Sequence, residues 1–184
     1  MKKKIVLLGD SIRLWGYGPI VEQTLKDEYE IFQPEDNCRF VKYTLRMIFD
    51  LHKQIKDADV IHFNCGHWDV TDLFGDGELF STDEEYAANL KRIITQLKKI
   101  TPNVIFATTT PVCPDYPYNK CENIERFNRI ATETLAPYGV VINDLYTPVA
   151  ENYKLYLSDD GIHLSEQGSR LCATLTVDAI KNFK

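Results

Sequence analysis

The chain has 184 residues and a formal net charge of -6, from 21 Lys and Arg against 27 Asp and Glu. With 44% hydrophobic and 26% charged residues it has the composition of a soluble globular protein rather than a disordered one. The negative charge disfavours nucleic acid and anionic lipid as partners, and the length predicts a single domain over residues 1–184.

Short apolar runs alternate with longer amphipathic segments along the whole chain. The short runs predict buried strands, at residues 4–8, 29–32, 59–64, 104–107 and 140–142. The amphipathic segments predict helices, at residues 19–26, 40–55, 82–100, 124–135 and 165–182. Glycine- and proline-bearing stretches predict loops, at residues 66–79 and 111–118. This alternation predicts a three-layer α/β/α sandwich with a five-stranded parallel sheet, flavodoxin-like in outline.

No segment predicts export or membrane insertion. No apolar run approaches the roughly 20 residues that a membrane-spanning helix needs. The apolar run at residues 5–8 is shorter than the roughly 7 to 15 residues of a signal sequence core. The five cysteines are odd in number and never spaced C-x-x-C, which favours reduced thiols. We therefore expect a cytoplasmic protein.

Ligands of parallel sheets bind outside the carboxyl ends of the strands, so residues that follow strands are the candidate site. Ser11 follows the first strand on a turn through Gly9, and Asp160 and His163 precede the last helix. Each motif alone is typical of a turn or a helix cap. Together they supply a nucleophile, a base for its proton and a carboxylate that fixes the imidazole tautomer, which are the groups that acyl transfer needs.

Gly9-Asp10-Ser11-Ile12 resembles the first sequence block of the GDSL-type, or SGNH, hydrolases, and Asp160-Gly161-Ile162-His163 resembles their last block, Asp-x-x-His. The resemblance extends from residue 4 to the last helix. It implies the SGNH hydrolase fold and a serine esterase that works through an acyl-enzyme. It also implies Ser11 as nucleophile, His163 as base and Asp160 as its partner, with no metal and no cofactor.

The middle blocks depart from the family pattern. The segment 66–69 is similar to the third block, Gly-x-Asn-Asp, but Trp68 stands at the asparagine. In the second block Cys38 stands at a position that is normally glycine. In the family, the oxyanion is held by the backbone N–H of the serine, the backbone N–H of that glycine and the side chain of that asparagine.

We expect the backbone N–H groups of Ser11 and Cys38 to remain in the oxyanion hole, because a change of side chain leaves a backbone donor in place. For the third donor we expect the amide of Asn64, which ends the same strand as the third block. The alternatives are Asn37, the indole N–H of Trp68, and a hole formed by the two backbone N–H groups alone.

We expect His67 and Trp68 to line the substrate pocket. Arg13, Trp15 and Tyr17 either form the opposite wall or serve as ordinary packing. Aromatic walls suit sugar rings, and the histidine in the third block is similar to the Gly-His-Asn-Asp version of the family. The expected substrate is therefore a small ester, foremost a carbohydrate O-acetyl ester. The alternatives are a lysophospholipase or thioesterase on acyl chains, and a non-catalytic binding module that has lost its oxyanion hole.

Other polar residues near the strand ends have structural interpretations. Asp10 is expected to cap backbone N–H groups or to pin a neighbouring loop, and Asp69 is expected to do the same for its own loop. His62, Cys65 and His67 suggest a metal site, but side chains alternate along a strand, so His62 and Cys65 point to opposite faces. We therefore predict no metal there.

Overall fold

The computed structural model describes residues 2–183 and contains one sheet in which every strand pair is parallel. Its strands are β1 (Lys4–Leu8), β2 (Glu30–Phe32), β3 (Val60–Phe63), β4 (Val104–Ala107) and β5 (Val141–Asn143). Their order in the sheet is β2-β1-β3-β4-β5, as in doubly wound flavodoxin-like sheets. The predicted fold class is thus confirmed, with each strand within one residue of its expected bounds.

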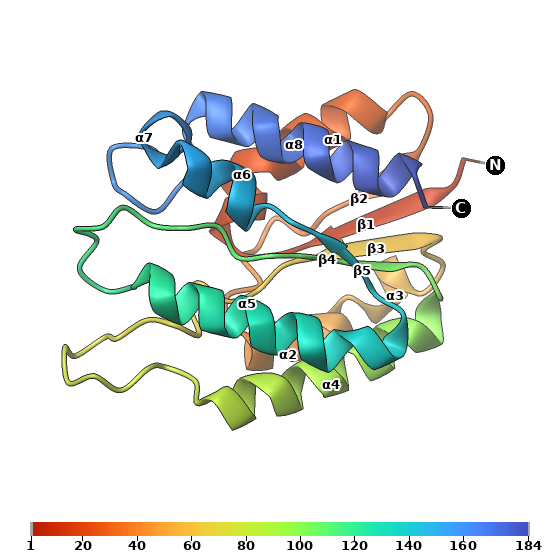
Figure 1. Cartoon of the computed structure of the whole chain (residues 1–184). Helices are drawn as coiled ribbons and strands as arrows, with labels where there is room; N and C mark the ends of the chain where they lie inside the picture. Colours follow the sequence, from red (N-terminus) through yellow and green to blue (C-terminus); the bar gives the residue numbers. More distant parts are fainter. Residues whose placement is uncertain (1, 184) are drawn as a thin grey trace.

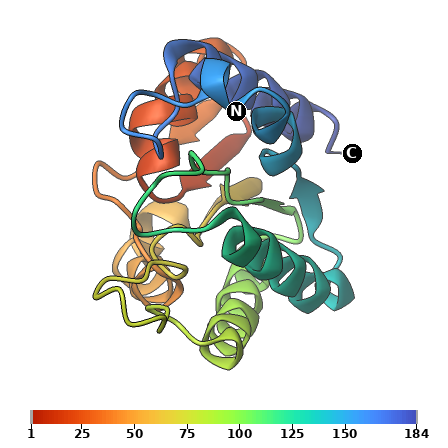
Figure 2. The same cartoon turned by 60° about the vertical axis from the view of Figure 1, so that its left-hand side comes forward.

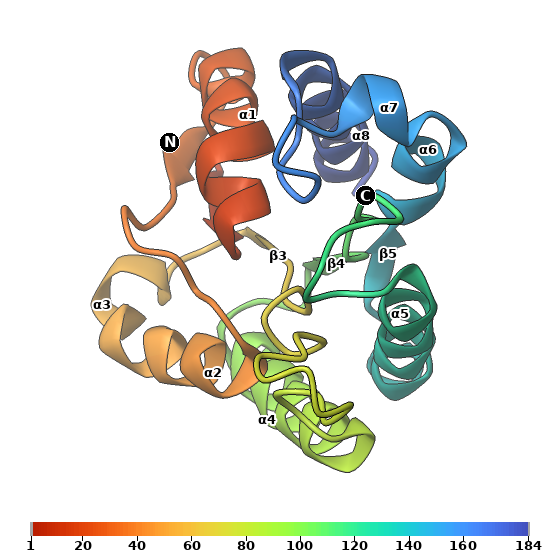
Figure 3. The ribbon, with the colours of Figure 1, turned by 90° about the vertical axis from the view of Figure 1, so that its left-hand side faces the viewer.

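Helices cover both faces of the sheet (Figures 1 and 3). One face is covered by α1 (Gly18–Leu25), α6 (Tyr146–Glu151), α7 (Tyr153–Tyr156) and α8 (Glu166–Lys181). The other face is covered by α2 (Val41–Asp50), α3 (His52–Ile55), α4 (Asp83–Ile100) and α5 (Cys121–Leu135). Two further helical segments are not α-helices: η1 (Ile12–Tyr17) is a π-helix and η2 (Ala136–Tyr138) is a 3-10 helix.

The two layers of helices enclose two separate cores, and β1 contributes to both. Val6 and Leu8 pack in the core under α2, α4 and α5, whereas Ile5 and Leu7 pack in the core under α1 and α8. Successive side chains of a strand point to opposite faces, so a strand covered on both sides is apolar at every position. This explains why the strands were visible in the sequence as short continuous apolar runs.

The predicted helix starts of α4 and α8 are confirmed by their caps. Thr82 Oγ1 accepts the backbone N–H of Glu85 at 3.2 Å, and the Glu85 carboxylate accepts the backbone N–H of Thr82 at the same distance. Ser165 Oγ accepts the N–H of Gly168 at 3.0 Å. Both contacts satisfy N–H groups that have no acceptor within the helix.

Some elements differ from expectation. The helix predicted over residues 40–55 is interrupted at Leu51, whose φ of -91° and ψ of 7° leave the helical range, so α2 and α3 are separate. The turn η1 and the short helices α6 and α7 were not predicted, because elements this short cannot show a repeating apolar pattern. Within residues 2–183, the structure has no helix of the length and apolar character needed to cross a bilayer.

The strands run from the end of the molecule that carries both termini toward the opposite end (Figure 1). Figure 2 turns that opposite end forward and shows the long loop before α4 in yellow and the loop before α5 in green. The carboxyl ends of β1 and β3 lie beside each other there, where the strand order reverses direction. A doubly wound sheet places its ligand at such a point.

Candidate active site

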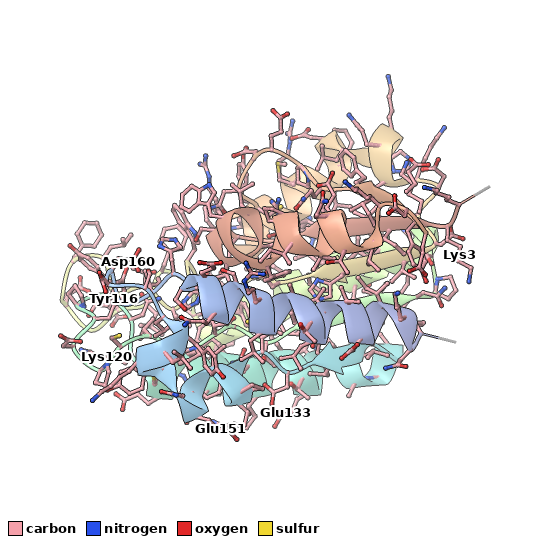
Figure 4. All side chains as sticks on the ribbon, turned by 90° about the horizontal axis from the view of Figure 1, so that it is seen from above. Lys3, Tyr116, Lys120, Glu133, Glu151 and Asp160 are labelled. Carbon is pink, nitrogen blue, oxygen red and sulfur yellow. The ribbon has the colours of Figure 1, made fainter. Side chains whose placement is uncertain are left out.

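Ser11, His163 and Asp160 form a continuous chain of hydrogen bonds at the carboxyl ends of the strands. The Nε2 of His163 lies 2.9 Å from the Oγ of Ser11, although the two residues are 152 positions apart. The Nδ1 of His163 lies 2.6 Å from Oδ2 of Asp160. In Figure 4, Asp160 lies at the end of the molecule far from Lys3, which precedes β1. The sequence-predicted triad is therefore assembled in the folded chain.

The carboxylate of Asp160 is held by its own loop. Its Oδ1 accepts the backbone N–H groups of Ile162 and His163, at 3.0 and 2.9 Å, and the hydroxyl of Ser158 at 2.8 Å. Burial opposes ionisation, but the hydrogen bonds from the His163 ring and these other donors outweigh it and hold the pKa of Asp160 well below its usual range. Asp160 is therefore an anion that can stabilise a positively charged imidazole.

The loop that carries these two residues is closed at its base. Leu157 and Leu164 form an antiparallel bridge, and the N–H of Ser158 donates to the carbonyl of His163 at 2.8 Å. Gly161 turns the chain at a φ of +78°, in the left-handed region that favours glycine. These contacts fix the direction of the imidazole before any substrate arrives.

The turn that carries Ser11 depends on Gly9. A Cβ on Gly9 would lie 2.0 Å from Oδ1 of Asn64, so the asparagine side chain packs directly against the backbone that precedes the serine. Oδ1 of Asp10 accepts the N–H of Ile12 at 3.0 Å. Of the two structural interpretations of Asp10, this bond confirms that it caps a backbone N–H group.

Asp69 has the same kind of role in the neighbouring loop. Its carboxylate accepts the N–H of Val41, the first residue of α2, and the hydroxyl of Ser81 at 2.7 Å. Burial raises the pKa of Asp69 to about 7, against the hydrogen bonds that lower it. The structural interpretation of Asp69 is thus confirmed.

The three predicted oxyanion donors have different surroundings. The N–H of Ser11 belongs to the first turn of a helix, where N–H groups have no acceptor within the helix. The N–H of Cys38 donates to the carbonyl of Gly9 at 3.0 Å, so it is already paired with the protein. Asn64 is 3% exposed, and its Oδ1 accepts the hydroxyl of Tyr17 at 2.9 Å. Membership of the hole remains a prediction for all three.

Arg13 ties the serine turn to the loop that contains Cys38. Its fully buried guanidinium donates to the carbonyls of Gly9 at 3.2 Å and of Pro34 and Asp36, both at 2.9 Å. Sequence reasoning left open whether Arg13, Trp15 and Tyr17 wall the pocket; of the three, Trp15 alone lines it. Arg13 and Tyr17 are buried supports behind the site.

A pocket of about 300 Å³ opens beside the Ser11 hydroxyl. Its lining comes from five separate segments and comprises Ser11, Trp15, Asn37, His67, Trp68, Thr71, Leu73, Tyr116, Tyr118, Ile162 and His163. The predicted pocket residues His67 and Trp68 are among them. The Trp15 ring lies 5.3 Å from the His163 ring, and Trp15 and Trp68 remain 69% and 43% exposed. The pocket is therefore a shallow aromatic depression rather than a tunnel.

Sequence reasoning missed the two tyrosines of this lining, Tyr116 and Tyr118. Both lie in the proline-rich loop that follows β4 (Figure 4 labels Tyr116 beside Asp160). The position of this loop after a strand was the available signal, because loops at the carboxyl ends of parallel strands form the ligand site.

His67 is a neutral, buried part of the pocket wall. Its Nε2 lies 3.0 Å from Oγ1 of Thr110, and its backbone carbonyl accepts the amide of Asn119 at 3.0 Å. Burial lowers the pKa of His67 to about 4. At neutral pH it therefore contributes an uncharged ring to the pocket wall, with Nε2 near Thr110 and Nδ1 near Asn119.

The histidine and cysteine cluster suggested by the sequence does not converge. His62 points into the core under α8, where its Nε2 lies 3.2 Å from Nδ2 of Asn143, and burial lowers the pKa of His62 to about 3. Cys65 lies in the other core, and His67 faces the pocket. In the described part of the chain, no three His, Cys, Asp or Glu side chains are grouped so as to hold a metal ion.

A serine hydrolase is the class of protein that this doubly wound sheet and this hydrogen-bonded triad define. The model of the GDSL-like Lipase/Acylhydrolase family matches residues 7–171, and the chain belongs to this family. It is therefore an SGNH-type hydrolase that acts on ester bonds.

Solved structures share its fold at low sequence identity. The lipase/acylhydrolase from Enterococcus faecalis has a TM-score of 0.80 at 23% identity, with 97% of this chain and 95% of that chain covered. The acetylxylan esterase Axe2 from Geobacillus stearothermophilus has a TM-score of 0.79 at 19% identity, with 99% and 95% covered. The acetyl xylan esterase AlAXEase has a TM-score of 0.77 at 20% identity, with 96% and 99% covered. A comparison with curated protein sequences finds no significant match.

Proposed function

We propose that this protein is a carbohydrate O-acetylesterase in which Ser11 is the nucleophile and His163 the general base. Asp160 orients the imidazole and stabilises its protonated form. The observation that carries the proposal is the position of the triad. The Ser11 Oγ lies within hydrogen-bond reach of His163 and at the edge of a small, open, aromatic pocket.

The reaction follows from the triad geometry. Ser11 Oγ attacks the ester carbonyl carbon while Nε2 of His163 takes the hydroxyl proton. His163 then returns this proton to the leaving alcohol oxygen as the carbon–oxygen bond breaks, which leaves an acetyl-serine. In the second stage the same imidazole takes a proton from water, whose oxygen attacks the acetyl carbon. The bond to Ser11 Oγ then breaks, acetate leaves, and His163 returns the proton to Ser11 Oγ. Asp160 stabilises the imidazolium at both stages, and the chemistry needs no metal or organic cofactor.

The negative oxygen of each tetrahedral intermediate needs donors, and we propose the N–H of Ser11 and the side-chain amide of Asn64 as the principal two. Cys38 N–H is the third proposed donor, shared with the Gly9 carbonyl that it already contacts. Trp68 is 43% exposed on the pocket wall, and we assign it to substrate binding.

The size and walls of the pocket support an acetyl ester of a sugar. A volume of about 300 Å³ is at the lower limit for ligand pockets, which favours a small acyl group. Trp15, Trp68 and Tyr118 offer exposed aromatic faces beside it, the kind of surface against which sugar rings pack. The fold shared with two acetylxylan esterases is consistent with this substrate class.

One observation favours a second candidate, hydrolysis of esters or thioesters of acyl chains. Leu73 and Ile162 join the aromatic residues of the lining, and Phe74, which follows Leu73 in the chain, is 87% exposed. An acyl chain could lie across this apolar surface outside the pocket itself.

The test is a panel of p-nitrophenyl esters from acetate to decanoate, measured beside acetylated xylo-oligosaccharides. We expect kcat/KM to be highest for acetate and at least tenfold lower at hexanoate, with acetate released from the sugars. A kcat/KM that rises with chain length would establish the second candidate instead. Failure of Ser11 to react with a fluorophosphonate, together with no turnover of any ester, would show a non-catalytic binding protein.

A further inference from the structure

The hydroxyl of Tyr17 is buried behind the site and has one partner. Tyr17 is the last residue of η1, and its hydroxyl donates to Oδ1 of Asn64 at 2.9 Å. The Tyr17 side chain is fully buried, and its ring packs edge-on against His62 at 5.7 Å. Neither Tyr17 nor Asn64 lines the substrate pocket, so this bond lies behind the reacting atoms.

The bond determines which end of the Asn64 amide is free. Oδ1 is held by Tyr17 and lies against Gly9. Among residues 2–183, Nδ2 of Asn64 donates to no acceptor. It is also absent from the group of side-chain atoms that are both fully buried and without a hydrogen-bond partner. The nitrogen is therefore the end of the amide that remains able to donate.

An asparagine amide turned by half a circle has nearly the same shape but exchanges its donor and acceptor. In that orientation Tyr17 would have to accept from Nδ2, and its own proton would lose its acceptor among the described residues. Burial raises the pKa of Tyr17 well above its ordinary value, so the hydroxyl keeps that proton. A buried donor without an acceptor is costly, and the turned amide is therefore disfavoured.

We propose that Tyr17 is a positioning residue that orients the Asn64 amide so that Nδ2, and not Oδ1, faces the oxyanion. The proposal rests on the proposed function, in which Asn64 is an oxyanion donor. Tyr17 touches no substrate and acts through Asn64. A turned amide would place a partly negative oxygen beside the developing negative charge, which is the opposite of what the transition state requires.

The first experiment compares Tyr17→Phe with Tyr86→Phe, using p-nitrophenyl acetate. Tyr86 is a matched control because it is also fully buried and its hydroxyl donates to the carbonyl of Cys65, next to Asn64, at 2.9 Å. That carbonyl also accepts from Thr109, so it keeps a partner when the hydroxyl is removed. We expect both variants to lower the melting temperature. We expect Tyr17→Phe to lower kcat about tenfold at constant KM, as misplaced catalytic groups do, and Tyr86→Phe to leave kcat within twofold.

The second experiment removes both partners. Asn64→Ala should lower kcat more than Tyr17→Phe does, and adding Tyr17→Phe to Asn64→Ala should change kcat by less than twofold, because the residue through which Tyr17 acts is gone. The double variant removes the hydroxyl and the amide together, so no buried polar group of this pair is left unpaired. It can therefore be measured even if Tyr17→Phe alone does not fold.

The outcomes separate this proposal from the function on which it rests. A Tyr17→Phe enzyme with unchanged kcat, while Asn64→Ala is slow, would overturn the role of Tyr17 and leave Asn64 as a donor. A double variant much slower than Asn64→Ala would also overturn it, because Tyr17 would then act by another route. If neither residue affects kcat but Ser11→Ala abolishes it, the esterase stands and the assignment of the oxyanion hole fails.

Discussion

The two halves of the site are built in opposite ways. The acid–base half consists of Asp160 and His163 on a surface loop, with side chains that are 51% and 31% exposed. The proposed oxyanion half, with Asn64 and Tyr17, is buried behind the serine turn. One half is held by hydrogen bonds within a short loop, whereas the other is held by contacts between distant parts of the chain. The acid–base half can therefore form from local sequence, but the oxyanion half requires the finished fold.

This difference has a physical basis in the reaction. The imidazole becomes charged during each cycle and then exchanges a proton with the alcohol and with water, so it must reach solvent and substrate. The oxyanion donors do not exchange protons and are most effective when they are fixed in a site from which water is excluded. Exposure suits the first half and rigidity suits the second.

The largest expected effect comes from the acid–base half together with Ser11, the hydroxyl on which it acts. Ser11→Ala and His163→Ala should each lower kcat/KM by about 10⁴-fold or more, and the double variant should be no worse, because these residues act as a unit. Asp160→Asn should cost less than either. Unfolding in urea should show Ser11→Ala within about 1 kcal/mol of wild type, because the variant loses one hydrogen bond of a small side chain. Wild-type turnover by Ser11→Ala would show that Ser11 is not the nucleophile.

A smaller effect is expected from the oxyanion half. Asn64→Ala should lower kcat about 10²-fold with little change in KM, the usual cost of losing one oxyanion donor. Trp68→Phe keeps an aromatic ring on the pocket wall but removes its N–H, and it should change kcat by less than about threefold if the indole donates nothing to the oxyanion. Steady-state kinetics with p-nitrophenyl acetate measure both. A slow Trp68→Phe beside a normal Asn64→Ala would instead assign the donor to the indole.

The smallest effect concerns stability, and it distinguishes the two halves by pH. His62 packs against Tyr17 in the buried half, and burial lowers the pKa of His62 to about 3. Since the folded chain binds this proton more weakly than the unfolded chain, the stabilisation is present above the ordinary pKa of about 6.5 and is lost as the pH falls toward 3. The buried half should therefore weaken in mild acid, where Asp160 remains ionised.

His62→Leu provides the measurement, because Asn143 keeps its bond to Thr176 at 3.2 Å in that variant. Below about pH 6.5, the unfolding free energy of wild type should fall relative to His62→Leu by up to about 1.4 kcal/mol per pH unit. Urea unfolding at pH 7, 6 and 5 measures the difference. His52→Leu, at an exposed position, should leave the slope unchanged. Parallel curves for wild type and His62→Leu would mean that the histidine is not held neutral by folding.

The sequence by itself determined the layers of the fold and the local geometry of the proposed acid–base residues. Strands covered on both faces appear as short apolar runs, and the capped helices α4 and α8 carry their start signals within four residues. The segment from Asp160 to His163 carries its own geometry, because the aspartate accepts backbone N–H groups two and three positions ahead. Local patterns of this kind can be recognised in the sequence without knowledge of the tertiary structure.

The tertiary structure alone decided the contact between Tyr17 and Asn64 and the full lining of the pocket. The bond from Tyr17 to Asn64 joins residues 47 positions apart, and no local pattern connects them. The turn that carries Tyr17 is a π-helix of one short stretch, too brief to leave a periodic signal. Tyr116 and Tyr118 reach the pocket because the loop after β4 lies at the same end of the sheet as the segments that carry Ser11 and His67. Such contacts depend on how strands are ordered and loops cross in space, and that information is spread over the whole chain rather than over neighbouring residues.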